Sequence, residues 1–170
     1  MTGLNVLEPS KEDLYLGELK AKLSLLKPLG ENKLSPQLSE LRSFVIDTHS
    51  DCEEMFENLV VKKLYTIASP HRQALAKTFP EFSKTVKAKI FVNTPWVKKL
   101  ILVQSLDIID DSLFKELKKL NDLRVIFSHP INKKYKIYND NQRQIWAYNL
   151  LINCLEKLAV EDEFFGIQSI

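Results

Sequence analysis

The feature of this sequence that most constrains its fold is a long, uninterrupted helical pattern over residues 36–67. Ser35 is a suitable N-cap, and Pro36 suits the first helical position because its missing N–H loses no partner there. A helix of about 30 residues is roughly 45 Å long, so the pattern predicts the spine of a helical bundle. The apolar side chains recur at intervals of three and four, which places them on one face: Leu38, Leu41, Val45, Cys52, Met55, Phe56, Leu59, Val60 and Leu64.

Three more helices are predicted downstream. Residues 95–109 carry a dense apolar pattern, and residues 113–127 resume it after an Asp-Asp-Ser stop and cap. Pro130 ends this segment, because proline interrupts the backbone hydrogen bonds of a helix. The last helix is expected over residues 139–159. The predicted fold class is therefore all-α, a four-helix up-and-down bundle over residues 35–160.

The remaining segments are expected to be accessory to this bundle. Residues 1–34 are predicted to form a tail and an extra N-terminal helix, and residues 68–94 a helical insertion. Residues 161–170 are predicted to form an acidic and aromatic tail. Glycine is scarce, with four residues in 170, which favours helices over a turn-rich β fold.

Composition and motifs argue against several classes of protein. The apolar fraction of 45% and the charged fraction of 27% are typical of a globular domain. No apolar run reaches about 18 residues and no signal-peptide pattern is seen, which predicts a cytoplasmic protein without membrane contact. Cys52 and Cys154 lie in apolar helical patterns and are expected to be buried free thiols. Metal-ligand spacings and phosphate-binding loops are missing, so neither a metal nor another cofactor is predicted.

The histidines are the first candidates for acid–base chemistry. His71 follows a proline and is interpreted as a surface residue. His49 lies two helical turns after Arg42 and between two aspartates. We expect it to be a partly exposed histidine near carboxylates, with a supporting role in a groove as the alternative. Three glutamates of the same helix are interpreted as a solvated face: Glu53, Glu54 and Glu57.

The stretch 120-LNDLRVIFSHP-130 places an arginine and the third histidine at a helix end. Arg124 and His129 would not share a helical face, since five residues rotate by about 140°. Pro130, however, disfavours the α conformation for the residue before it, which lets the imidazole swing off the helix end. A guanidinium can stabilise charge on phosphorus and an imidazole can move a proton. The simpler interpretation is a capping histidine beside a surface arginine.

Basic and aromatic residues surround this pair in the sequence. Lysines bind a phosphate backbone and tyrosines stack on unpaired bases. RNA is therefore a candidate partner through Lys118, Lys133, Lys134 and Tyr135. An exposed, solubilising helix face followed by a basic loop explains the same residues equally well.

The segment 95–130 resembles the HEPN superfamily, and within it the mannitol-operon repressor-like domains. The resemblance is carried by a Lys/Leu-rich helix, a turn at 106-LDII-109 and a helix that ends in LR and FSHP. It implies a four-helix bundle, usually a homodimer, with an arginine and a histidine in a cleft that cleaves RNA without metal. By position, Arg124 would hold the scissile phosphate and His129 would act as general base or acid.

One position departs from the family pattern. HEPN proteins commonly have Asn, Asp or His directly after the arginine, where this chain has Val125. The valine side chain forms no hydrogen bond, and two functions therefore remain open. The first is RNA binding or cleavage in a toxin–antitoxin, defence or stress setting. The second is a non-catalytic regulatory dimer that holds a protein partner, such as an antitoxin.

Overall fold

The computed structural model describes residues 11–31, 38–68, 78–129 and 133–167, and all regular structure in these ranges is helical. A π-helical turn, η2 (Lys87–Phe91), continues α4, and a 3₁₀ helix, η3 (Lys133–Asn139), precedes α7. The prediction of an all-α fold is confirmed. The α-helices of the described ranges are α1 (Lys11–Gly30), α2 (Leu38–Ala68), α4 (Phe79–Val86), α5 (Trp96–Ser105), α6 (Asp111–Ser128) and α7 (Asn141–Ile167).

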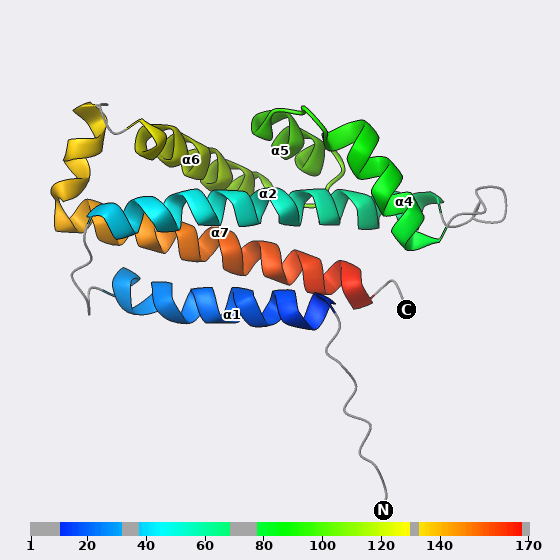
Figure 1. Cartoon of the computed structure of the whole chain (residues 1–170), viewed down its shortest axis with the longest axis horizontal. Coiled ribbons are helices and arrows are strands. Elements are labelled where there is room, and N and C mark those ends of the chain that lie inside the picture. Colours follow the sequence, from blue (N-terminus) through cyan, green and yellow to red (C-terminus); the bar gives the residue numbers. More distant parts are fainter. Residues whose placement is uncertain (1–10, 32–37, 69–77, 130–132, 168–170) are drawn as a thin grey trace, which may run out of the picture.

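The helix α2 lies at the centre of the molecule. It packs against α5, α6 and α7, and α1 packs against α7 (Figure 1). The helix α4 contacts α2 near the C-terminal end of α2. The C-terminal end of α6, the 3₁₀ helix η3 and the start of α7 lie together at the opposite end of the molecule (Figure 1, left). The predicted arginine–histidine motif therefore lies at a junction of three elements.

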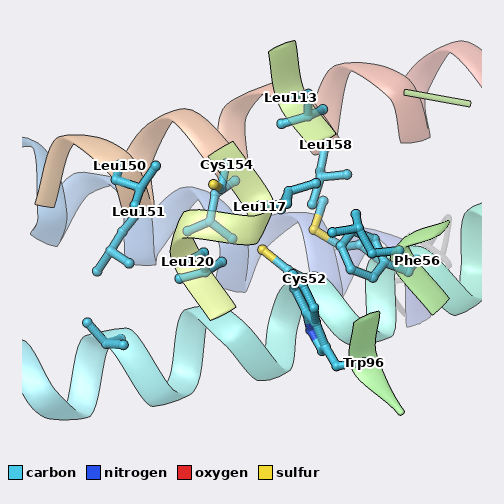
Figure 2. Close-up of a cluster of buried hydrophobic side chains, with 14 of the residues drawn as sticks. Cys52, Phe56, Trp96, Leu113, Leu117, Leu120, Leu150, Leu151, Cys154 and Leu158 are labelled. Atoms are coloured by element: carbon cyan, nitrogen blue, oxygen red, sulfur yellow. The ribbon is translucent and has the colours of Figure 1, made fainter. Parts of the chain in front are cut away.

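The core forms because each long helix contributes an apolar stripe. On α6 the buried residues recur at intervals of three and four: Leu113, Leu117, Leu120, Leu123 and Phe127. Figure 2 shows Cys52 of α2 and Cys154 of α7 within this apolar packing. Both thiols are free and buried, as predicted. Burial raises the pKa of Cys154 to about 12, so its thiol stays protonated and unreactive at neutral pH.

Two helices end earlier or later than the sequence predicted, and α1 continues through a proline. The helix α1 continues two residues past Pro28, where burial of Leu26 and Leu29 offsets the hydrogen bond that proline removes. The helix α5 ends at Ser105, because Asp107 adopts a φ of 52° and turns the chain. The helix α7 runs to Ile167, through most of the predicted acidic tail. As a whole, α7 packs against α1 and α2.

Within its described part, the predicted insertion is helical from Phe79 to Phe91. The backbone N–H of Thr78 donates to Glu81 at 3.1 Å, and Pro80 occupies the first turn of α4, where its missing N–H is harmless. After α4 the backbone continues without a break into η2, which ends at Phe91. Residues 69–77, including His71, lie outside the described part. None of the described helices combines the length and apolar character needed to cross a membrane.

Tyr148 of α7 provides a test of this core. Its side chain is fully buried and its ring meets Phe44 edge-on at 6.0 Å, yet its hydroxyl has no hydrogen-bond partner within the described residues. Removing an unsatisfied buried hydroxyl is neutral or favourable. We expect Tyr148→Phe to raise the free energy of unfolding by no more than about 1–2 kcal/mol. Urea denaturation measures this change. A loss of more than about 1 kcal/mol would show that the hydroxyl is satisfied in solution.

Candidate functional site

Arg124 lies on the solvent side of α6, one helical turn before the end of the helix. Its neighbours Leu123 and Phe127 are buried, while Arg124 itself and Val125 are exposed. Within the described ranges Arg124 forms no ion pair. A guanidinium that is exposed and has no carboxylate partner is free to bind an external anion.

His129 leaves the helix as its position before proline predicts. The helix α6 ends at Ser128, whose hydroxyl donates to the Arg124 carbonyl at 2.7 Å. His129 follows with φ of −117° and ψ of 82°, outside the α region. Its ring is exposed and forms no hydrogen bond to the described residues. The imidazole therefore caps none of the described carbonyls. The simpler interpretation of the sequence was that His129 is a capping residue.

His49 is buried, which corrects the expectation of a partly exposed histidine among carboxylates. Its ring stacks on the Trp96 indole at a centroid distance of 4.6 Å. Its Nε2 lies 3.3 Å from Oδ1 of Asn121 on α6, so the tautomer with a proton on Nε2 fits this contact. Of the two flanking aspartates, Asp47 is exposed and Asp51 instead binds Lys22 of α1. His49 thus connects α2, α5 and α6.

The surroundings of His49 disfavour its charged form. Burial lowers the pKa of His49, and the nearby positive charge of Arg124 lowers it further. The hydrogen bond to Asn121 and the negative charge of Glu53 act in the opposite direction and are outweighed. The effect of Arg124 on His49 places the candidate arginine within electrostatic reach of this buried histidine.

This lowered pKa gives a pH dependence of stability. Between the folded pKa and the ordinary value of 6.5, the unfolded chain binds more protons than the folded chain, so the free energy of unfolding rises with pH. The contribution of neutral His49 to the free energy of unfolding is fully present above about pH 6.5 and is lost as the pH falls below that value. We expect the loss of stability between about pH 7.5 and about pH 5 to be smaller in His49→Gln than in the parent. Urea denaturation at both pH values measures it, and equal losses would contradict it.

Beside His49, a buried lysine binds two glutamates of α2. The Nζ of Lys99 donates to Glu53 at 2.7 Å and to Glu57 at 2.6 Å, and it lies 5.8 Å from the Phe91 ring centre. Burial alone would lower the pKa of Lys99, but the two hydrogen-bonded carboxylates outweigh it and raise the pKa. Glu53 and Glu57 are therefore not the solvated face that the sequence suggested, although Glu54 is exposed.

The candidate RNA-binding residues are only partly described. Lys118 is exposed on α6, with its Nζ 5.9 Å from the ring centre of Phe114. The backbone of the other three opens η3, but their side chains lie outside the described part: Lys133, Lys134 and Tyr135. No group of three or more metal-binding side chains occurs among the described residues.

Two aromatic residues that the sequence did not identify as site residues line a pocket near the motif. Tyr138 of η3 is 6% exposed and packs on Phe127 with ring centres 5.1 Å apart. Trp146 of α7 is 45% exposed. Both line an open pocket of about 490 Å³ at the junction of η3 and α7. A helical wheel of α7 would have shown that Trp146 departs from the stripe of Ala147 and Leu151.

Known proteins do not add to this picture: the chain matches no protein-family model, no curated protein and no solved structure. The resemblance to HEPN domains therefore rests on the residues of the segment 95–130 alone.

Proposed function

We propose that this chain is a HEPN-like helical domain that binds RNA and cleaves it without a metal ion. The observation that carries the proposal is Arg124, an exposed arginine without an ion-pair partner in the described residues, placed one turn before a helix end from which His129 emerges exposed. An exposed guanidinium without a carboxylate partner is available to bind a phosphate outside the chain.

In the proposed reaction the 2′-hydroxyl of the RNA attacks the adjacent phosphorus. The new P–O2′ bond forms as the P–O5′ bond breaks, which leaves a cyclic phosphate and a free 5′-hydroxyl. Arg124 stabilises the negative charge that develops on the phosphoryl oxygens. His129 acts either as the base that takes the proton from the 2′-hydroxyl or as the acid that protonates the leaving O5′, and solvent water makes the other proton transfer. No oxidant, metal or further reactant is needed for this balance.

A second function is favoured by the apolar character of the surface near the motif. Val125, Ile137 and Trp146 are between 41% and 45% exposed. Large apolar side chains exposed on the elements that meet at this end of the molecule are of the kind that protein partners cover. The alternative proposal is a non-catalytic regulatory module that uses this surface to bind a second copy or a partner protein such as an antitoxin.

The experiment that separates the two is RNA degradation by the purified chain in the presence of EDTA. Cleavage that requires Arg124 supports the nuclease. No cleavage of a mixed RNA substrate, together with a mass above that of the monomer in light scattering, supports the regulatory module instead.

A further inference from the structure

The pocket beside the motif has walls held in place by specific contacts. The Gln144 side chain, which is buried, donates to the Tyr138 carbonyl at 2.7 Å and ties η3 to α7. The Asp140 carboxylate accepts from the Arg143 backbone N–H at 3.0 Å and caps α7. The ring of Tyr138 packs on Phe127 of α6. Three elements therefore fix the floor of the pocket.

The side chains that line the pocket offer stacking, positive charge and polar groups. They are Tyr138, Asp140, Gln142, Arg143 and Trp146. Burial raises the pKa of the Tyr138 phenol, and the positive charge of the exposed Arg143 nearby opposes this effect without outweighing it. The volume of about 490 Å³ lies within the range of about 300–1,000 Å³ that small-molecule sites have. The Trp146 indole forms an exposed wall.

We propose that this pocket receives an unpaired base of single-stranded RNA, stacked on Trp146. Aromatic faces bind bases of any sequence, and an adjacent arginine binds the neighbouring phosphate. Gln142 and the second oxygen of Asp140 provide hydrogen bonds for a base edge. The exposed Lys136 adds positive charge on η3, outside the pocket. This inference rests on the proposed function. It predicts that the bound RNA is single-stranded where it lies against η3.

Tryptophan fluorescence of the full chain tests which kind of ligand the pocket binds. Trp96 is 8% exposed and Trp146 is 45% exposed, so base stacking quenches mainly Trp146. The probes are a single-stranded oligoadenylate with 2′-O-methyl groups, which has no attacking hydroxyl, its duplex form, and adenosine monophosphate. We expect the single strand to quench and the duplex not to, because paired bases are already stacked. A mononucleotide that saturates at the same concentration as the strand would overturn the proposal in favour of a free nucleotide.

Binding of the single strand by variants tests the role of Trp146. Trp146→Ala is expected to weaken binding of the single strand about 5- to 150-fold, the range measured for loss of one stacked base. Trp146→Phe keeps a stacking face and should restore most of that loss. The matched control is Val160→Ala, which removes an exposed apolar side chain elsewhere on α7. Equal affinity of Trp146→Ala and the parent, with an unchanged circular dichroism spectrum, would overturn the proposal.

The outcome for this pocket can be told apart from the outcome for the nuclease. Cleavage that depends on Arg124 with binding indifferent to Trp146 keeps the proposed function and rejects the pocket. Binding that depends on Trp146 without any cleavage keeps the pocket and rejects the nuclease. A parent chain that binds no single-stranded RNA rejects both.

Discussion

RNA cleavage in EDTA is expected to fall by about 100- to 1,000-fold when Arg124 is replaced by alanine, as when one charge-stabilising donor is removed from an active site. Arg124 is exposed and lacks an ion pair within the described residues, so its loss should leave the fold intact. The measurement is the initial rate of cleavage of a labelled single-stranded RNA, with thermal unfolding measured on the same samples.

His129→Ala is expected to reduce the same rate by about 100- to 10,000-fold, since that is the usual contribution of a general acid or base.

The matched control for Arg124 is Lys20→Ala, which removes one exposed positive charge from α1, away from α6. If Lys20→Ala loses as much activity as Arg124→Ala, net charge rather than a site explains the effect. Cleavage that survives in both Arg124→Ala and His129→Ala would reject the assigned roles.

Lys99→Met is expected to lower the free energy of unfolding by about 2–3 kcal/mol. The change keeps the apolar stem but leaves Glu53 and Glu57 facing each other without the lysine that lies 2.7 and 2.6 Å from them. Removing one partner of a fully buried ion pair costs about 3–5 kcal/mol. We expect less here because the Glu53 side chain is 34% exposed and partly screened by water. Urea denaturation at neutral pH measures the change.

The neighbouring Lys98 provides the matched control for this prediction. It is exposed, so Lys98→Met should change stability by no more than about 0.5 kcal/mol. Adding Glu53→Gln and Glu57→Gln to Lys99→Met removes the unpaired charges and should recover at least half of the loss. A Lys99→Met protein as stable as Lys98→Met would mean that the buried ion pairs contribute nothing to stability.

The helices themselves were largely predictable, because they depend on local chemistry. The spacing of the apolar residues predicted the helix α2 and its buried face. The structure has this helix at Leu38–Ala68. The Asp110 cap is visible as the first residue of Asp-Asp-Ser, and its carboxylate accepts from Leu113 N–H at 2.7 Å. Pro130 marks the end of α6 and explains why His129 departs from helical geometry.

The surroundings of individual polar residues were not predictable in the same way. Asp47 and Asp51 suggested a solvated histidine at position 49, but Asp51 faces Lys22 of α1. Lys99 falls on the same stripe of α5 as Trp96 and Val103, so its burial was readable from periodicity. Its partners were not readable, since Glu53 and Glu57 precede it by more than forty positions.

By itself the sequence determined that the fold is all-α, where α6 stops and that an arginine and a histidine flank that stop. Spacing, caps and proline act over a few residues, so they can be read along the chain. Only the tertiary structure decided that His49 is covered by Trp96 and Asn121, that Lys99 joins two glutamates, and that Trp146 borders a pocket. These outcomes depend on which helix faces pack together, and the packing sets the burial and charge around each side chain.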